Sequence, residues 1–399
     1  MNENNLSKLP ETIGSADVVI VGAGIVGLAH AARALDAGYT VTVIERDHQA
    51  VGASVRNFGH CCITAQSGEL YRIAQDGRPL WLDYARRAGF WAVESGAVVV
   101  AATDTEMQVL LELSGEREAG QVKMLSAEQV AAELGRTDTH GILGGALLRD
   151  DLRVDPRTTV SKLAAWIDAQ PGGRVLFNTS ALGFDAGEAS RAVVRTSRGE
   201  IAANQVFVCV GHDVDYLFPQ LAAEHQIKRC ALQMARSAVQ EELKVSPAIL
   251  TATSMLRYEA FTGVPSADRL RQEVAARSPQ LLAAEANIMF TQRPDGSLLV
   301  GDSHTYDLTQ TPFLNERTST DLLEEIEEIL GAGQLEIAER WQGVYASSAV
   351  GPLLVADVAD GVTIVSVTAG VGMTLSFGLA QRNIAHRLTD SRQLSPLVK

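Results

Sequence analysis

The stretch Asp17-Val-Val-Ile-Val-Gly22-Ala-Gly24-Ile-Val-Gly27 decides the fold of this chain of 399 residues. Four apolar strand formers end at a glycine, and apolar or small residues then recur at helical spacing until Gly38. A second apolar run, from Tyr39 to Ile44, ends at the acid Glu45. This succession predicts a βαβ unit, which requires a parallel sheet and a right-handed crossover.

The glycines of Gly22-x-Gly24-x-x-Gly27 lie between the predicted strand and the predicted helix. Gly22 permits the tight turn, Gly24 lets the backbone approach a pyrophosphate, and Gly27 allows the helix to pack closely on the strand. The carboxylate of Glu45 can accept hydrogen bonds from an adenosine ribose and would repel a 2′-phosphate. The pattern predicts dinucleotide binding, but it does not by itself separate FAD from NAD.

Length and charge limit the remaining possibilities. At about 150 residues per domain the chain predicts two or three folding units, and a hydrophobic share of 46% suffices for a large core. Lys and Arg total 34 and Asp and Glu total 48, so the formal net charge is −14. Long-range electrostatics therefore oppose nucleic acid and anionic membrane as partners. Nothing in the sequence indicates the oligomeric state.

Cysteine usage and the N-terminus predict a cytoplasmic protein. The cysteines are Cys61, Cys62, Cys209 and Cys230, with no C-x-x-C pair and no zinc-site spacing. A reduced compartment is expected. The first 15 residues are polar and do not resemble a secretory signal, so we expect a frayed leader before the first strand.

One uncharged segment has the length of a membrane span. It runs for twenty residues from Gly361 to Ala380. Its glycines and hydroxyl residues, and a change from β-branched residues to helical spacing midway, instead predict a buried strand, a glycine-rich turn and a helix. We expect no membrane span.

Two further segments favour a flavin. The small residues of Gly52-Ala-Ser-Val-Arg-Asn-Phe-Gly59 can let the chain run along a diphosphate or the flavin edge, although an ordinary polar turn is the alternative. Thr368-Ala-Gly370-Val-Gly372-Met-Thr374 precedes a predicted helix. Bare N–H groups at that helix N-terminus suit the negative charge that develops on the pyrimidine side of a reduced flavin.

Together these residues resemble the FAD-dependent amine oxidoreductases of the D-amino-acid oxidase, glycine oxidase and sarcosine oxidase superfamily. Both ends of the chain carry specific motifs, whereas the middle is generic. The stretch Arg56-Asn-Phe-Gly-His60 further resembles a bacterial subgroup associated with the breakdown of aminophosphonates such as 2-aminoethylphosphonate. The segments that carry the wider resemblance are the N-terminal glycine motif, 52–59, Asp155-Pro156, 206–211, Arg293-Pro-Asp-Gly296 with Gly301, Trp341-Gln-Gly343 and 370–377.

The resemblance implies an α/β chain (α+β overall) with a Rossmann-like FAD-binding domain and an interleaved β-rich substrate domain. We expect residues 16–90, 141–225 and 331–399 in the first domain and residues 91–140 and 226–330 in the second. The strand-like patterns of Val98 to Leu113 and Ala231 to Val300 agree with the β-rich part. Arg174 to Leu182 is predicted as one strand, and Ser126, Asp155 and Asp321 begin predicted helices.

What the resemblance implies for function is oxidation of a small amine with an anionic group, by transfer of a hydride from the carbon next to nitrogen. The imine then hydrolyses to a carbonyl compound. No metal is required, and non-covalent FAD is expected, with Cys61 and Cys62 as small buried residues. No lysine stands out for the reaction with oxygen, so the electron acceptor stays open. The expected cofactor contacts are Gly22, Gly24, Ile25, Val26, Gly27, Glu45, Arg46, Ser54, Arg56, Asn57, Phe58, Gly59, Gly211, Gly370, Gly372, Met373 and Thr374.

Candidates for the substrate side carry charge or a titratable ring. Arg257 beside Tyr258, and Arg293, are candidates to hold the substrate anion, because the planar guanidinium matches carboxylate or phosphonate oxygens. A surface position is the alternative for both arginines. His60, His304 and Tyr345 are further active-site candidates, with structural histidines and aromatic core packing as alternatives.

Two other functions remain open from the sequence. The nearest is a glycine, sarcosine or D-amino-acid oxidase or dehydrogenase. The second is an NAD-dependent oxidoreductase, or a protein that binds its cofactor without this activity.

Overall fold

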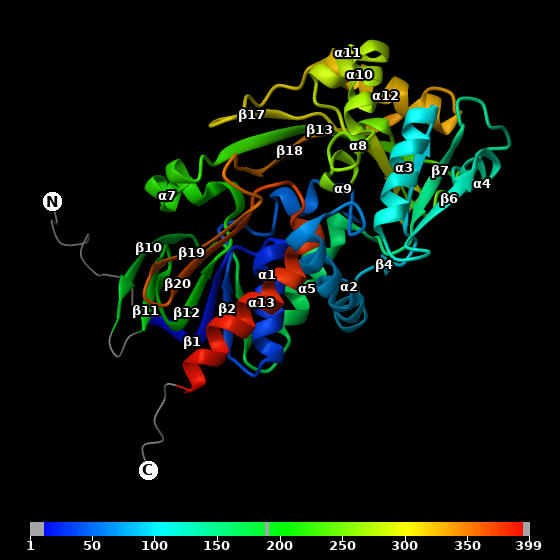
Figure 1. Ribbon diagram of the computed structural model, residues 1–399. Helices are drawn as coiled ribbons and strands as arrows, with labels where there is room; N and C mark the ends of the chain where they lie inside the picture. The colour runs from blue at the N-terminus through cyan, green and yellow to red at the C-terminus, as the bar shows by residue number, and fades with distance from the viewer. Residues whose placement is uncertain (1–11, 188–190, 394–399) are drawn as a thin grey trace.

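The predicted βαβ unit lies at the centre of an eight-stranded sheet (Figure 1). The computed structural model describes residues 12–187 and 191–393, so the predicted leader lies largely outside it. Strand β1 (Thr12–Val21) pairs in parallel with β2 (Val41–Ile44) and with β12 (Gly199–Val208), and α1 (Ile25–Asp36) connects β1 to β2. The predicted Rossmann-like α/β fold is thereby confirmed.

The sheet extends to both sides of this unit in the order β10-β11-β12-β1-β2-β9, while β20 pairs with the carboxyl half of β12 and β19 pairs with β20. Buried apolar residues occupy both faces of its central strands, as expected of parallel strands covered on both sides. The outer strands are β9 (Gly173–Leu176), β10 (Ala181–Ala186), β11 (Ala192–Thr196), β19 (Leu353–Ala359) and β20 (Val362–Val367).

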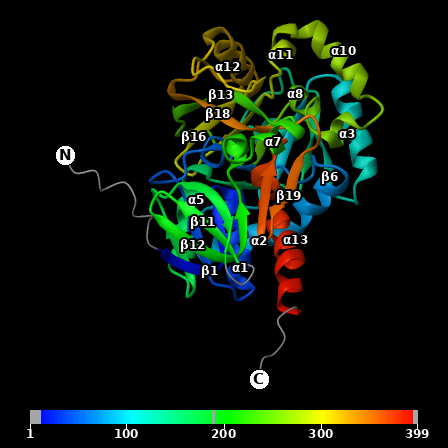
Figure 2. The same cartoon turned by 90° about the vertical axis from the view of Figure 1, so that its left-hand side faces the viewer.

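Four helices pack together beside this sheet: α1, α2 (Gly68–Ala88), α5 (Pro156–Asp168) and α13 (Gly372–Gln393). Figures 1 and 2 both place α13 next to α2. The two helices meet backbone to backbone, because a Cβ on Gly378 would lie 1.9 Å from the carbonyl oxygen of Ile73. Phe377 stacks on Tyr84 with ring centroids 4.8 Å apart, so this contact is both close and aromatic.

The uncharged segment from Gly361 to Ala380 forms β20, a turn and the start of α13. The prediction of strand, glycine-rich turn and helix is therefore confirmed. Across residues 12–187 and 191–393, no helix combines the length and apolar character needed to cross a membrane.

A nine-stranded sheet forms the other half of the molecule. Its order is β17-β13-β16-β15-β14-β5-β7-β6, with β18 paired to the other edge of β13, and all pairs are antiparallel except β14 with β5. Its strands are β5 (Ala97–Ala101), β6 (Val122–Ser126), β7 (Gly144–Leu148), β13 (Lys228–Val239), β14 (Ala248–Leu250), β15 (Met289–Gln292), β16 (Ser297–Gly301), β17 (Thr305–Asp307) and β18 (Ile337–Ser347).

Helices cover this second sheet, and α10, α11 and α12 lie at the end of the molecule opposite the carboxyl end of α13 (Figures 1 and 2). The longer helices are α3 (Asp104–Glu116), α4 (Ala127–Glu133), α10 (Ala267–Arg277) and α12 (Glu316–Leu330). The shorter ones are α6 (Val214–Leu217), α7 (Pro219–Glu224), α8 (Ala252–Met255), α9 (Glu259–Thr262), α11 (Pro279–Ala283) and the 3₁₀ turns η1 (Ala53–Val55) and η3 (Gly211–Asp213).

A small three-stranded sheet joins the halves. In it β8 (Leu152–Val154) pairs with both β3 (His60–Cys61) and β4 (Ala92–Val93). In the sequence, β3 follows β2 of the first sheet, β4 precedes β5 of the second sheet, and β8 lies between β7 and α5. The chain therefore passes repeatedly from one half to the other.

Several predicted elements differ from the structure. Much of Val98 to Leu113 is the helix α3, which Thr103 caps by accepting a hydrogen bond from the Glu106 backbone N–H. The range 231–300 also contains α8 to α11, and the predicted strand 174–182 is split between β9 and β10. Strands β7 and β18 lie in the ranges expected for the FAD-binding domain, yet both pair into the nine-stranded sheet. The domain boundaries themselves stay a prediction.

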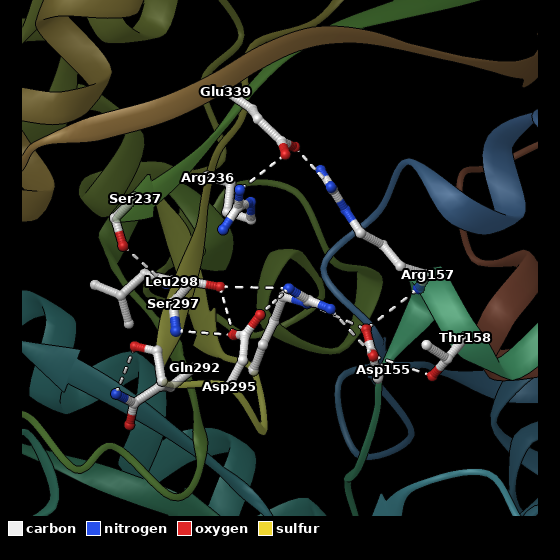
Figure 3. Close-up of polar contacts among 12 residues, drawn as sticks. Asp155, Arg157, Thr158, Arg236, Ser237, Gln292, Asp295, Ser297, Leu298 and Glu339 are labelled. Carbon is white, nitrogen blue, oxygen red and sulfur yellow. Dashed lines mark hydrogen bonds and ion pairs between the residues drawn. The ribbon is translucent and has the colours of Figure 1, made fainter. Parts of the chain in front are cut away.

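Ion pairs hold the start of α5 against the nine-stranded sheet (Figure 3). Arg157 of α5 lies 2.6 Å from Glu339, and Arg236 of β13 lies 2.8 Å from the other oxygen of that carboxylate. Asp155, the N-cap of α5, pairs with Arg293 at 3.2 Å. These contacts connect the two halves through buried and half-buried charges.

The position of Arg293 corrects its predicted role as a substrate ligand. Its guanidinium is already paired with Asp155 and Asp295, and it does not line the large cavity described below. Arg293→Ala is expected to lower the free energy of unfolding by on the order of 3 kcal/mol, because the buried Asp155 carboxylate loses its cation. The substrate KM is expected to stay unchanged.

Thermal unfolding and steady-state kinetics of the FAD-loaded variant check this expectation. Arg86→Ala serves as the control, since Arg86 forms an exposed pair with Asp83 on the same helix and should contribute little. A raised KM with unchanged stability would restore Arg293 as a substrate ligand.

Candidate functional site

A cavity of about 580 Å³ lies between the two large sheets. On one side it begins at the carboxyl ends of parallel strands, with Val21 of β1, Ile44 of β2 and Cys209 after β12 in its wall. On the other side it is bounded by Leu232 of β13 and Met289 of β15. Carboxyl ends of parallel strands are where open α/β sheets bind nucleotides.

The glycine motif shapes the first end of this cavity. Gly22 has φ +104°, a conformation that favours glycine, and a Cβ there would lie 2.6 Å from the Cys209 carbonyl oxygen. Gly24 is the N-cap of α1 and offers no side chain to the helix N–H groups. Glu45 accepts a hydrogen bond from the Ala23 N–H at 2.8 Å. The N-terminus of α1 therefore opens into the cavity, with no side chain at its N-cap Gly24.

The loop after β2 forms the next part of the wall. Ser54 accepts a hydrogen bond from the Ile25 N–H at 2.9 Å, which ties the loop to the start of α1. Arg56 donates to the Gln342 carbonyl oxygen at 3.2 Å, and Trp341 donates to the Arg56 carbonyl oxygen at 3.3 Å. Hydrogen bonds to both halves of the molecule thus fix the loop along the cavity.

The turn before α13 lines the opposite wall. Gly370 has φ +73°, and a Cβ there would lie 2.8 Å from the ring of Tyr345. At Gly372, the first residue of α13, a Cβ would find only Val26 at 4.0 Å, so the helix start is open to the cavity. Thr374 accepts a hydrogen bond from the Cys62 N–H at 3.0 Å. A second helix N-terminus therefore faces the same space as α1.

His60 lies in the cavity wall and is oriented by a buried acid. Its Nε2 is 2.8 Å from an Asp151 carboxylate oxygen, while the other oxygen accepts hydrogen bonds from the Ile63 and Thr64 N–H groups. Within the described residues, His60 Nδ1 is buried without a hydrogen-bond partner. Three donors satisfy Asp151, and Cys62 lies close to His60 and Asp151. Burial raises the pKa of the Cys62 thiol.

A second group of polar residues closes the cavity on the side of the nine-stranded sheet. Arg257 donates a hydrogen bond to the Tyr345 hydroxyl at 2.6 Å. His304 Nδ1 is 2.7 Å from the Glu285 carbonyl oxygen and therefore carries the proton, which leaves Nε2 as an acceptor. Burial, with a further contribution from Arg257, lowers the pKa of His304 well below its usual value. His304 is neutral at physiological pH.

The cavity brings together most of the residues that the sequence predicts for the site. All five substrate-side candidates, Arg257, Tyr258, His60, His304 and Tyr345, line the cavity. So do all the cofactor candidates except Gly27 and Gly59. A Cβ on Gly27 would lie 2.0 Å from the Gly22 carbonyl oxygen, so Gly27 serves helix packing as expected. Gly59 packs in the same way against Val154 and lies outside the lining of the cavity.

A family model described as DAO, FAD dependent oxidoreductase, matches residues 17–385 of the sequence. The chain belongs to this family. It is an FAD-dependent oxidoreductase, which confirms the cofactor and the enzyme class predicted from the sequence and removes the NAD-dependent alternative.

Solved structures share the fold of this oxidoreductase at low sequence identity. Glycine oxidase from Geobacillus kaustophilus has a TM-score of 0.74 and 18% identity, with 94% of this chain and 95% of that chain covered. L-proline dehydrogenase from P. horikoshii has a TM-score of 0.75 and 18% identity, with 95% and 94% covered. Iminodiacetate oxidase from Chelativorans sp. BNC1 has a TM-score of 0.71 and 17% identity, with 94% and 95% covered. No curated protein matched the sequence.

The residues present in this oxidoreductase fit FAD. The N-terminus of α1, at its N-cap Gly24, suits the pyrophosphate, and the start of α13 at Gly372 suits the electron-rich edge of the flavin. Glu45 lies at the end of β2, where an acid can contact the adenosine ribose. Arg46 lies beside it and pairs with Asp213 at 2.7 Å. The cavity extends from these groups to Arg257 and His304, so one continuous space holds the cofactor contacts and the substrate-side residues.

The FAD-dependent oxidoreductase has one buried acid at this site that the sequence analysis missed. Asp302 lines the cavity, and its side chain is only 5% exposed. Burial raises its pKa to about 7, although Arg257 and Asn287 act to lower it. The burial of Asp302 depends on β15 and β16 together, so a pattern in one short stretch of sequence does not reveal it. The only signal in the sequence was its position two residues before His304.

Proposed function

We propose that this enzyme oxidises a small amine carrying an anionic group, and that the substrate is an aminophosphonate such as 2-aminoethylphosphonate or an N-alkyl derivative. The carbon next to nitrogen is oxidised, and the imine hydrolyses to a carbonyl compound and ammonia or an amine. Bound FAD supplies the oxidant that accepts the hydride.

The observation that carries the proposal is the state of Arg257. This guanidinium lines the cavity and is held by Tyr345, yet within the described residues no carboxylate lies within ion-pair distance of it. Partly buried arginines are usually paired, so a cation left free in a cavity favours an anionic ligand. The net charge of −14 makes such a local cation necessary for a small anion to bind.

The names of the structural relatives support an amine substrate. Glycine, proline and iminodiacetate each carry an amine and a carboxylate, and enzymes named for them share this fold. The phosphonate rests on the resemblance of the stretch Arg56-Asn-Phe-Gly-His60, from which Arg56 and His60 line the cavity. The rival within the same chemistry is oxidation of glycine, sarcosine or a D-amino acid.

In this proposal, different residues of the cavity bind the substrate, exclude water and position the histidine. Arg257 binds the substrate anion, with Tyr345 holding the guanidinium in place. Apolar residues such as Met289 and Leu232 exclude water and so favour the neutral, reactive form of the amine. Asp151 positions His60 at the wall of the same cavity.

Anaerobic bleaching of the flavin band tests the substrate. The FAD-loaded enzyme is mixed separately with 2-aminoethylphosphonate, its N-methyl derivative, glycine, sarcosine and D-alanine. We expect the phosphonates to bleach the flavin at the lowest concentrations. If glycine or D-alanine bleaches it readily and the phosphonates do not, the phosphonate assignment is wrong and the rival stands.

A further inference from the structure

Asp302 lines the substrate cavity, and one oxygen of its carboxylate has no hydrogen-bond partner in the described chain. Its Oδ1 is buried and has no hydrogen-bond partner. Its Oδ2 lies 3.9 Å from His304 Nε2, which is too far for a hydrogen bond. Unsatisfied buried carboxylate oxygens are costly, so a donor from outside the chain is expected at this position.

The backbone around Asp302 is firmly held. Its N–H donates to the Asn287 carbonyl oxygen at 2.9 Å, and the Asn287 N–H donates to the Asp302 carbonyl oxygen at 2.8 Å. Asp302 directly follows β16, and β16 pairs with β13 on one edge and with β15 on the other. Asp302 is therefore held by a backbone pair that continues the β15–β16 pairing just outside the bounds of both strands.

The cavity thus contains a carboxylate and a guanidinium cation that form no ion pair with each other in the described chain. Arg257 acts electrostatically on Asp302, but no ion pair within 4.0 Å joins them in the described chain. A ligand with both a positive and a negative group can satisfy each of them in turn. A purely anionic ligand would satisfy Arg257 and leave Asp302 without a partner.

Other groups around Asp302 do not supply the missing proton or positive charge. His304, on the segment after β16, is neutral because burial and Arg257 lower its pKa. Tyr258 and Tyr345 stay protonated, since burial raises the pKa of both hydroxyls. The remaining neighbours are Asn287, an amide, and Cys230 of β13, whose thiol pKa burial raises to about 11. Among the described groups that act on Asp302, Arg257 carries the fixed charge.

We propose that Asp302 binds the ammonium group of the substrate and accepts one of its protons, so that the cavity selects zwitterions held between Asp302 and Arg257. This inference rests on the proposed function and deepens it. In the proton transfer, an N–H bond of the ammonium breaks and its electron pair stays on nitrogen. The proton forms an O–H bond with the Asp302 carboxylate. The neutral amine then has the lone pair that oxidation at the adjacent carbon requires.

The raised pKa of Asp302 agrees with this role. With a pKa of about 7, the carboxylate is charged above neutrality and can take up a proton within the physiological range. Activity should therefore rise with pH through about 7 as Asp302 ionises. An ordinary aspartate would be a much weaker proton acceptor, since its pKa is about 3.9.

The first test is the pH profile of Asp302→Asn, with bound FAD verified by its absorbance. At pH 7.5 the kcat/KM for the amine is expected to fall roughly 100-fold, the usual effect of losing a general base. The deficit should shrink to within about tenfold near pH 10, because the free substrate amine then loses its own proton. Glu325→Gln is the matched control: burial also raises the pKa of Glu325, but this residue lies on α12 outside the cavity.

The second test uses ligand binding and needs no turnover. Dissociation constants of 2-aminoethylphosphonate and ethylphosphonate are measured by perturbation of the flavin spectrum, with glycine and acetate as a second pair. Asp302→Asn should weaken binding of the amino compound by roughly 30-fold or more. The compound without an amine should bind at least as tightly as to the wild type.

Wild-type enzyme gives the same information if the variant does not fold. Between pH 6 and pH 8 the carboxylates of glycine and acetate stay ionised, so glycine should bind more tightly as Asp302 ionises and acetate should bind more weakly. Equal weakening of both members of a pair by Asp302→Asn, a pH-independent deficit, or identical pH trends in the wild type would overturn the inference. If no amine reduces the flavin but the amino compounds still bind through Asp302, the proposed function fails and this binding site stands.

Discussion

Arg257→Ala is expected to lower kcat/KM by about 30-fold to several thousand-fold, corresponding to 2 to 5 kcal/mol for a lost buried charge partner. The loss should appear mainly as a raised KM, because the guanidinium holds the non-reacting end of the substrate. Arg257 lies beside Tyr345 in the cavity wall, and its guanidinium can form a bidentate pair with carboxylate or phosphonate oxygens. Arg257→Lys should be intermediate, since it keeps the charge and loses the planar fork.

Steady-state kinetics on FAD-loaded protein measure this effect. Arg271→Ala is the control, because Arg271 is exposed on α10 and reaches only the Leu256 carbonyl oxygen. The control should leave KM within error of the wild type. An unchanged KM in Arg257→Ala would show that the substrate anion binds elsewhere.

Gly24→Val is expected to leave protein without FAD. A Cβ at this position would already lie 3.2 Å from Ser54 Oγ, and the branched methyl groups of valine would extend into the space in front of the α1 N-terminus. That space is where the pyrophosphate must approach the backbone. The flavin content should fall from about one per chain to nearly none, as judged by the absorbance near 450 nm, the usual flavin band.

Gly115→Val controls for the introduction of valine at a helix glycine. Gly115 is exposed on α3, and a Cβ there would meet no atom within 4 Å. This control should retain its flavin while losing a little helix stability. Yellow Gly24→Val protein with a normal flavin content would contradict the placement of the pyrophosphate.

The local parts of the fold were predictable from the sequence because local physics decides them. The first strand, α1 and β2 follow from apolar spacing and three glycines, and the capping box at Ser126 begins α4 as expected. The helix α3 was missed because its valines and leucines resemble a strand when the cap at Thr103 is overlooked. Its boundary depends on one side-chain hydrogen bond that a hydrophobic pattern does not reveal.

In the site, too, residues in short continuous motifs were predictable, and residues whose surroundings come from distant parts of the chain were not. Residues of the glycine motif and of the turn before α13 belong to short continuous patterns, so their place in the cavity was predictable. Arg293 was misassigned because its partner Asp155 lies 138 positions away in the sequence. Asp302 was missed for the opposite reason: an aspartate after a strand looks like an ordinary turn residue until the neighbouring strands bury it.

The most direct test of the account is a single-turnover experiment. FAD-loaded enzyme is mixed without oxygen with excess 2-aminoethylphosphonate, and flavin bleaching and carbonyl product are measured on the same sample. We predict complete bleaching with one carbonyl formed for each flavin reduced, and loss of this reaction at low substrate in Arg257→Ala. A flavin that stays oxidised with every anionic amine tried, or that is reduced without formation of a carbonyl, would contradict the account.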